Sequence, residues 1–85
     1  MNWHLYIRGK AKKQFKKVPK DYSEHILRAI DEIGVDPHDG DVQKMAGDDR
    51  VWRKRIGSYR IKFEIYEERM VIYIFEIKRR TSSTY

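Results

Sequence analysis

The sequence predicts an α+β fold in which a strand and a two-helix hairpin precede a three-stranded antiparallel meander. Apolar residues recur at helical spacing as far as residue 33, whereas beyond residue 50 the apolar period changes to two, which is typical of half-buried strands. Two-residue turns separate the late strands, and connections this short join only antiparallel neighbours. We expect the helices to cover one face of the sheet and to leave the other face for water or a ligand.

The N-terminal half begins with a short aromatic and β-branched run, residues 3–7, which suits a first strand. Residues 10–18 follow with apolar positions at helical spacing, and Pro19 ends this helix or begins the next. Asp21 can cap a second helix, and Gly34 is placed to end it. The apolar stripe of this second helix consists of Tyr22, Ile26, Ala29, Ile30 and Ile33.

The C-terminal half follows a loop at residues 36–41, the clearest break in the chain. Three predicted strands then alternate apolar and polar side chains: residues 51–56, 59–66 and 70–77. The tail, residues 81–85, is polar except for its last residue. No repeat or linker divides the chain, and we expect one domain over residues 1–85 because 85 residues can close only one hydrophobic core.

Composition excludes several classes of protein. The chain contains no cysteine, which excludes a disulfide framework and a cysteine-ligated zinc site. It shows neither the apolar run of a signal peptide nor a stretch long enough to span a bilayer. We therefore expect a soluble, cytoplasmic protein that does not associate with a membrane.

Charge is the strongest compositional signal. Nineteen Lys and Arg against thirteen Asp and Glu give a net charge of +6. Sixteen of the nineteen positive charges fall in three segments without any acid: residues 8–20, 50–62 and 78–80. Segregation of this kind creates a positive surface that attracts polyanions, although a lysine-rich solvated face is an alternative.

Arginines occupy alternating positions in two of the predicted strands. Alternation places Arg53 and Arg55 on the face opposite Trp52 and Ile56. It also places Arg60 opposite the apolar residues of the following strand, so the three arginines meet on the open face if Trp52 and Ile56 face the core. Like charges that close repel one another, and an anionic ligand is a physical reason to gather them. An ordinary exposed strand face is the alternative.

Other catalytic arrangements find no support in the sequence. His4, His25 and His38 lie far apart, without metal-ligand spacing. Gly40, Gly47 and Gly57 are isolated turn residues rather than a phosphate loop, and Ser82 and Ser83 have no histidine near them in the sequence. We expect no metal and no cofactor. Arginine with aromatic residues remains, a combination that suits phosphate clamping and base stacking.

The motifs, taken in order, resemble the RelE/ParE superfamily of toxins. Residues 52–61, WRKRIGSYRI, are similar to its "wRiRiGdYRiiY" signature. Residues 36–37 and 43–47 are similar to its "dP…kkL.G" stretch, residues 70–74 to its last strand and residues 78–85 to its closing "hR…Y" element. The likeness spans essentially the whole chain and implies a RelE-like form of the predicted fold.

The resemblance implies one of two activities. RelE-like members cut mRNA in the ribosomal A site, whereas ParE-like members poison DNA gyrase and lack the nuclease residues. The nuclease residues are basic side chains of one strand, the arginine of the "YR" pair, and an arginine and a tyrosine near the C-terminus. They fall here on Arg53, Arg55, Arg60, Arg79 and Tyr85. Because all five positions hold suitable residue types, we expect the nuclease; a gyrase poison and a member that only binds antitoxin or RNA are the alternatives.

One departure from the family pattern concerns the proton acceptor. The best-known nuclease of this type has lysines where this chain has Arg53 and Arg55. Arginine stabilises a pentavalent phosphate but stays protonated, which makes it a poor general base. A one-residue slip of the strand would bring Lys54 to the open face but would bury the arginines, and we reject it. Tyr85 either stacks on a base or helps to activate the 2′-hydroxyl.

The resemblance also implies a reaction and its partners. The 2′-hydroxyl of the RNA attacks the neighbouring phosphate and leaves a 2′,3′-cyclic phosphate and a 5′-hydroxyl. Arg60 and Arg53 neutralise the phosphate, Arg55 or Arg79 assists the leaving oxygen, and no metal is required. The expected partners are mRNA on the ribosome, with contacts to ribosomal RNA, and an acidic antitoxin that displaces the tail or buries the helices. A monomer is favoured for the free toxin.

Overall fold

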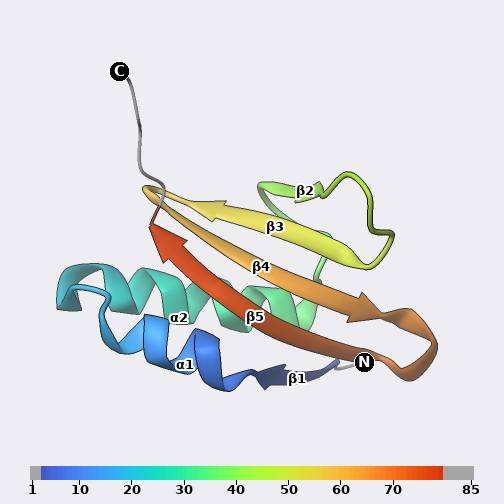
Figure 1. Ribbon diagram of the computed structural model, residues 1–85, viewed down its shortest axis with the longest axis horizontal. Coiled ribbons are helices and arrows are strands. Elements are labelled where there is room, and N and C mark those ends of the chain that lie inside the picture. The colour runs from blue at the N-terminus through green and yellow to red at the C-terminus, as the bar shows by residue number, and fades with distance from the viewer. Residues whose placement is uncertain (1–2, 80–85) are drawn as a thin grey trace.

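A computed structural model describes residues 3–79 of the chain (Figure 1). The elements follow in the order β1 (His4–Ile7), α1 (Gly9–Lys16), α2 (Lys20–Val35), β2 (Val42–Lys44), β3 (Val51–Ile56), β4 (Tyr59–Tyr66), the 3-10 turn η1 (Glu67–Arg69) and β5 (Val71–Arg79). This order confirms the predicted class, with a helical hairpin between the first strand and a meander of long strands.

The strands form one five-stranded mixed sheet in the order β1-β5-β4-β3-β2. β3, β4 and β5 make the predicted antiparallel meander, and β1 adds to β5 in parallel. The sequence prediction missed β2, a three-residue strand that pairs with β3. Three residues are too few to show a periodic pattern, so only the pairing identifies them as a strand.

Two details of α2 correct the prediction. The helix begins at Lys20 with Pro19 at its N-cap, so Asp21 lies in the first turn and does not cap it. A negative charge there still interacts favourably with the helix dipole. Gly34 lies inside the helix, which continues to Val35.

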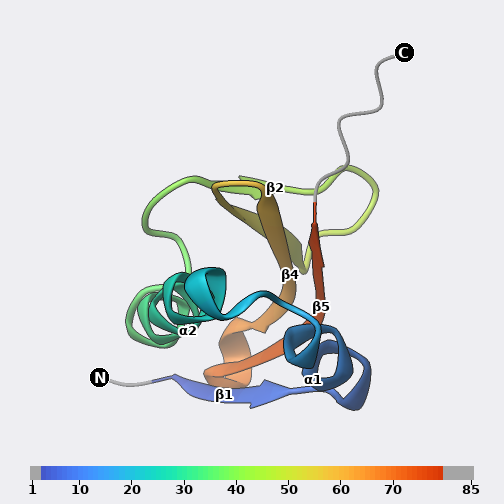
Figure 2. The ribbon, with the colours of Figure 1, turned by 90° about the vertical axis from the view of Figure 1, so that its left-hand side faces the viewer.

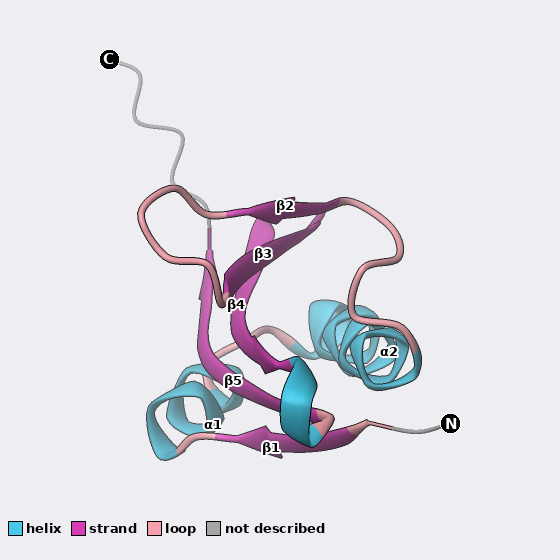
Figure 3. Ribbon diagram, turned by 90° about the vertical axis from the view of Figure 1, so that its right-hand side faces the viewer, coloured by secondary structure: helices cyan, strands magenta, loops and turns pink. Residues whose placement is uncertain are grey.

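The hydrophobic core lies on one face of the sheet. α2 contributes the predicted stripe residues Ile26, Ala29, Ile30 and Ile33, and α1 contributes Ala11. Alternate residues of β4 complete the layer with isoleucines of β5: Tyr59, Ile61, Phe63, Ile65, Ile72, Ile74 and Ile77. Figures 2 and 3 show α2 to one side of β4 and α1 close to β1 and β5. No helix within residues 3–79 is long and apolar enough to cross a bilayer.

α1 also covers part of the edge of β5. β1 pairs with β5 only from Val71 to Ile74. Farther along, the backbone N–H of Ile77 donates a hydrogen bond of 2.8 Å to Oε1 of Gln14 on α1. A helix side chain thus satisfies a backbone donor that a strand neighbour would otherwise have to satisfy.

A bulge at Phe75 reverses the alternation of β5. Lys62 of β4 pairs with Glu76, whereas the residue after Lys62 pairs with Ile74, so β5 contains one extra residue. The buried isoleucines of β5 are therefore even-numbered before the bulge and odd-numbered after it. As a result, Glu76 and Lys78 lie opposite open-face residues of β4. Without the bulge, a strict period of two would turn both toward the core.

Candidate nucleic-acid interface

The open face of the sheet brings together three of the predicted site residues. Arg55 pairs directly with Arg60 across the β3–β4 ladder, and Arg53 pairs with Lys62. Cross-strand partners share a face, with Cβ atoms about 4.5–5.5 Å apart. The alternate residues Trp52 and Ile56 pack against the core, which is the condition under which the arginines meet on the open face.

Two rows of side chains cross the strands here, and we call them the cationic rows. The first consists of Arg55, Arg60 and Lys78, and the second of Gln43, Arg53, Lys62 and Glu76. Alternation within β4 also assigns Lys62 to this face. Lys78 and Glu76 could not be assigned in that way, because their orientation depends on the bulge.

Polar neighbours hold several of these side chains in place. Arg53 donates a hydrogen bond from Nη2 to Oε1 of Gln43, and Arg55 donates from Nε to Oδ2 of Asp41 at 3.1 Å. Glu76 lies between two lysines, with Nζ of Lys62 and Nζ of Lys10 each 3.5 Å from one of its oxygens. The face is therefore positive and also ordered by its own ion pairs.

Lys54 lies on the opposite face, which confirms the rejection of a register slip. Its side chain is 6% exposed, and its Nζ lies 2.8 Å from Oε1 of Glu32 on α2. The hydrogen bond from Lys54 and its charge hold the pKa of the Glu32 carboxyl below its usual range. This ion pair is the reason that a lysine can be buried between the sheet and the helix.

Arg79 lies apart from the cationic rows. It pairs with Tyr59, which is buried on the core face. Cross-strand partners share a face, so the Arg79 side chain lies on the core side of the sheet. There it borders a pocket of about 440 Å³ that is lined by Gln14, Lys17, Val18, Pro19, Tyr59, Ile77, Lys78 and Arg79. Lys78 is the C-terminal cation that pairs with Arg60. Tyr85, the fifth predicted site residue, lies outside the described residues.

A stripe of tyrosines continues the open face beyond the cationic rows. It consists of Tyr6, Tyr66 and Tyr73, which we call the tyrosine stripe. Tyr73 stacks on Tyr6 and meets the edge of Tyr66, with ring centroids 5.6 Å apart in both pairs. Arg8 lies over the Tyr73 ring at 4.4 Å, and Arg50 lies over the Tyr66 ring at 4.6 Å. Aromatic rings beside guanidinium groups suit the stacking of nucleic-acid bases.

The sequence prediction did not recognise the tyrosine stripe. Alternation within β4 identifies Tyr66 as an open-face residue. Tyr6 and Tyr73 become neighbours through the parallel pairing of β1 with β5, and neither strand alone predicts that pairing.

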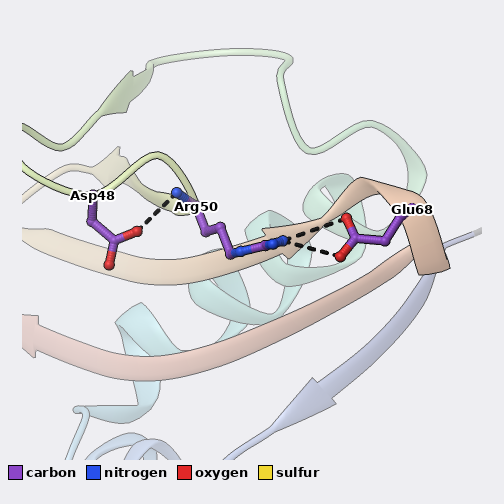
Figure 4. Close-up of polar contacts among 3 residues, drawn as sticks. All are labelled: Asp48, Arg50 and Glu68. Atoms are coloured by element: carbon purple, nitrogen blue, oxygen red, sulfur yellow. Dashed lines mark hydrogen bonds and ion pairs between the residues drawn. The ribbon is translucent and has the colours of Figure 1, made fainter.

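Contacts at both ends fix Arg50 beside this stripe (Figure 4). Its backbone N–H donates a hydrogen bond of 2.9 Å to Oδ1 of Asp48. Its guanidinium Nη1 lies 3.2 Å and 3.4 Å from the two carboxylate oxygens of Glu68. The arginine is thus oriented over Tyr66 from the loop that precedes β3.

His25 and His38 take no part in the open face, whereas alternation in β1 places His4 on the same face as Tyr6. His38 pairs with Glu67 at 3.3 Å and meets the Trp52 ring edge-on, and His25 meets the ring of Tyr22. Within residues 3–79, no three His, Cys, Asp or Glu side chains are grouped so that they could hold a metal ion.

Known proteins resemble the chain in both sequence and fold. The family model described as "ParE toxin of type II toxin-antitoxin system, parDE" matches residues 5–83. The Methanocaldococcus jannaschii protein that bears the name toxin RelE1 is 25% identical over 83 residues, which cover 94% of this chain and 92% of that protein. These similarities extend over nearly the whole chain and confirm the resemblance that the motifs predicted.

Solved structures agree with the sequence comparisons. A chain of the archaeal RelE-RelB complex from Pyrococcus horikoshii OT3 superposes with a TM-score of 0.83 at 25% identity, covering 98% of this chain and 100% of that one. The isolated E. coli RelE toxin superposes with a TM-score of 0.83 at 17% identity, covering 95% of this chain and 87% of that one. The second likeness shows a shared fold.

Proposed function

The chain belongs to the RelE/ParE superfamily and is a toxin of a type II toxin–antitoxin system, and from this premise we propose that it is a ribosome-dependent endoribonuclease that cuts mRNA. The observation that carries the proposal is the cross-strand register that gathers Arg53, Arg55 and Arg60 on an open face. The similarity to proteins named RelE supports the same choice.

The proposed substrate lies across the open face, with a phosphate on the cationic rows and a neighbouring base on the tyrosine stripe. Adjacent rows are about 7 Å apart, because two residues of a strand separate them. Successive nucleotides of an extended RNA can therefore contact the arginines and the tyrosines together. Base stacking on an aromatic side chain contributes about 1–3 kcal/mol per base.

The buried part of Arg53 supports an anionic ligand. Its Nε is buried and has no hydrogen-bond partner among residues 3–79. A buried donor without an acceptor costs about 1–3 kcal/mol, and a phosphate oxygen is a suitable acceptor. Substrate binding would therefore recover free energy that the free protein lacks.

In the proposed reaction, the 2′-hydroxyl attacks the adjacent phosphate and leaves a 2′,3′-cyclic phosphate and a 5′-hydroxyl. Arg53 and Arg60 neutralise the non-bridging oxygens, and Arg55 assists the leaving oxygen. Arg79 and Tyr85 keep the roles that the family resemblance implies, a further contact to the leaving group or phosphate and a base-stacking or proton-transferring ring. The nucleophile belongs to the substrate, so the proposal needs no metal.

An acidic antitoxin is the second proposed partner. The P. horikoshii relative was solved as a RelE-RelB complex, and the open face of this chain is positive. An acidic segment that covers the cationic rows would block the substrate path directly. An activity on translating ribosomes would be cytoplasmic.

Cleavage of ribosome-bound mRNA by purified toxin tests the proposal. The expected products carry a 2′,3′-cyclic phosphate and a 5′-hydroxyl, and gyrase supercoiling should be unaffected. The matching family description, which names a ParE toxin, favours the second candidate, a gyrase poison. If the toxin inhibits supercoiling by gyrase and leaves the mRNA intact, it is a gyrase poison and not a nuclease.

A further inference from the structure

The proposed cleavage needs an acceptor for the proton of the 2′-hydroxyl. Arginine cannot accept it, because the guanidinium stays protonated at any ordinary pH. Within residues 3–79, three carboxylates that neighbour Arg53, Arg55 or Arg60 are candidates for the proton acceptor: Asp41, Glu64 and Glu76.

Their positions on the face distinguish them. Asp41 lies at the outer edge, bonded to Arg55, and its side chain is 59% exposed. Glu64 lies in the row of the tyrosine stripe, opposite Tyr73, and pairs with Arg8 at 3.7 Å. Glu76 lies within the cationic rows and is only 16% exposed. Of the three, Glu76 is the most buried, since Glu64 is 25% exposed, and it is the one that contacts two cations.

Glu76 is also the diagonal neighbour of Arg60. The ladder pairs Lys62 with Glu76 and Arg60 with Lys78, so Glu76 and Arg60 stand in adjacent rows of neighbouring strands. Diagonal neighbours of this kind have Cβ atoms about 7 Å apart. A phosphate that contacts Arg60 therefore has its adjacent ribose within reach of the Glu76 carboxylate.

The bulge at Phe75 is the feature that turns Glu76 onto this face. Bulges often lie next to active sites, where they redirect a side chain. Regular alternation would have directed Glu76 into the core, and the extra residue instead directs a carboxylate into a cluster of positive side chains. A carboxylate placed there has oxygen lone pairs that can accept a proton.

We infer that Glu76 is the general base, which accepts the proton of the substrate 2′-hydroxyl; this inference rests on the proposed nuclease function. Its ion pairs with Lys10 and Lys62, at 3.5 Å each, are longer than tight charge-assisted hydrogen bonds of about 2.7–2.9 Å. Lone pairs of the carboxylate therefore remain available to a hydroxyl group. Lys10 is 67% exposed and can move aside as the substrate enters.

The 2′-oxygen forms a bond to phosphorus while its proton passes to the Glu76 carboxylate. The bond between phosphorus and the 5′-oxygen breaks, and its electron pair stays on the 5′-oxygen, which takes a proton from solvent water. Glu76 then returns its proton to solvent.

Glu76→Gln tests the inference, with Glu64→Gln as the matched control on the same face. Glutamine keeps the size of the side chain but cannot accept the proton. Single-turnover cleavage of ribosome-bound mRNA by Glu76→Gln should fall roughly 10²–10⁴-fold, the range of general acid–base catalysis. Ribosome binding should stay equal or tighten, because a negative charge is lost. Glu76→Asp should retain part of the activity, and thermal unfolding of each variant reports its folding.

Chemical rescue separates a base from a residue that only positions Lys62. Formate and acetate should restore cleavage to Glu76→Ala, and more strongly as the basicity of the anion rises. Rescue that is absent, or independent of basicity, overturns the assignment. If Glu76→Gln cleaves as fast as the wild-type toxin, Glu76 is not the general base, and the proposed nuclease function is unaffected. If the wild-type toxin leaves ribosome-bound mRNA intact, the proposed function itself fails.

Discussion

Gly57 controls the turn that sets Arg55 opposite Arg60, and Gly57→Ala should destabilise the protein by about 1.5–3.5 kcal/mol. Its φ is +55°, where a residue with a Cβ pays about 1–2 kcal/mol of strain. An added Cβ would also lie 2.3 Å from the hydroxyl oxygen of Tyr22. That hydroxyl accepts a hydrogen bond of 3.3 Å from the Ser58 backbone N–H, which the clash would break at a cost of about 0.5–1.5 kcal/mol.

Urea unfolding of Gly57→Ala, Gly47→Ala, Tyr22→Phe and the Tyr22→Phe/Gly57→Ala double variant measures these contributions separately. Gly47 also has a positive φ, +90°, but an added Cβ there meets nothing within 4 Å, so it should show backbone strain alone. The double variant should lose less stability than the two single losses predict, because the hydroxyl that clashes is gone. Equal losses at Gly57 and Gly47, together with full additivity, would refute the contact argument.

Three further predictions concern charge and the tail. Affinity for ribosomes should fall steeply between low and moderate salt, and a flat dependence would contradict binding through the cationic rows. Removal of residues 81–85 should eliminate mRNA cleavage. Tyr85→Phe should cleave at a near-normal rate if the ring only stacks on a base. If the Tyr85 hydroxyl transfers a proton, the cleavage rate of Tyr85→Phe should fall roughly 10²–10⁴-fold. Equal cleavage by the truncated toxin would exclude any role for the tail. The lowered pKa of Glu32 means that its ion pair stabilises the fold fully above the usual carboxyl range and less as the pH falls through the lowered pKa. Unfolding free energies measured against pH should therefore lose stability at acid pH in the wild type and lose less in Lys54→Met; parallel curves would contradict this.

The arginine cluster could be predicted because nothing interrupts the period of two through β3 and β4. Each buried residue of β4 is followed by a more exposed one along its whole length. The turn at Gly57 then sets the register, and Arg55 necessarily opposes Arg60. Uninterrupted alternation and a short turn are local features, and local features can be read from a sequence.

The rest of the site depends on features that are not local. The bulge at Phe75 leaves no compositional mark, so the orientation of Glu76 and Lys78 had to come from the ladder. The motif likewise selects Arg79 as a site residue without regard to the face on which it lies. The tyrosine stripe requires β1 to join the far side of β5, and the pattern within β1 does not specify its neighbour.

Mapping of mRNA 5′ ends after induction of the wild-type toxin and of Arg60→Ala tests the central claim most directly. The wild type should produce cuts in phase with codons, and Arg60→Ala should produce few or none while remaining folded. Ile61→Ala is the structural control, because it truncates a fully buried side chain and should cost about 2–5 kcal/mol of stability. Full toxicity of Arg60→Ala, or wild-type toxicity with DNA damage and intact mRNA, would contradict the account.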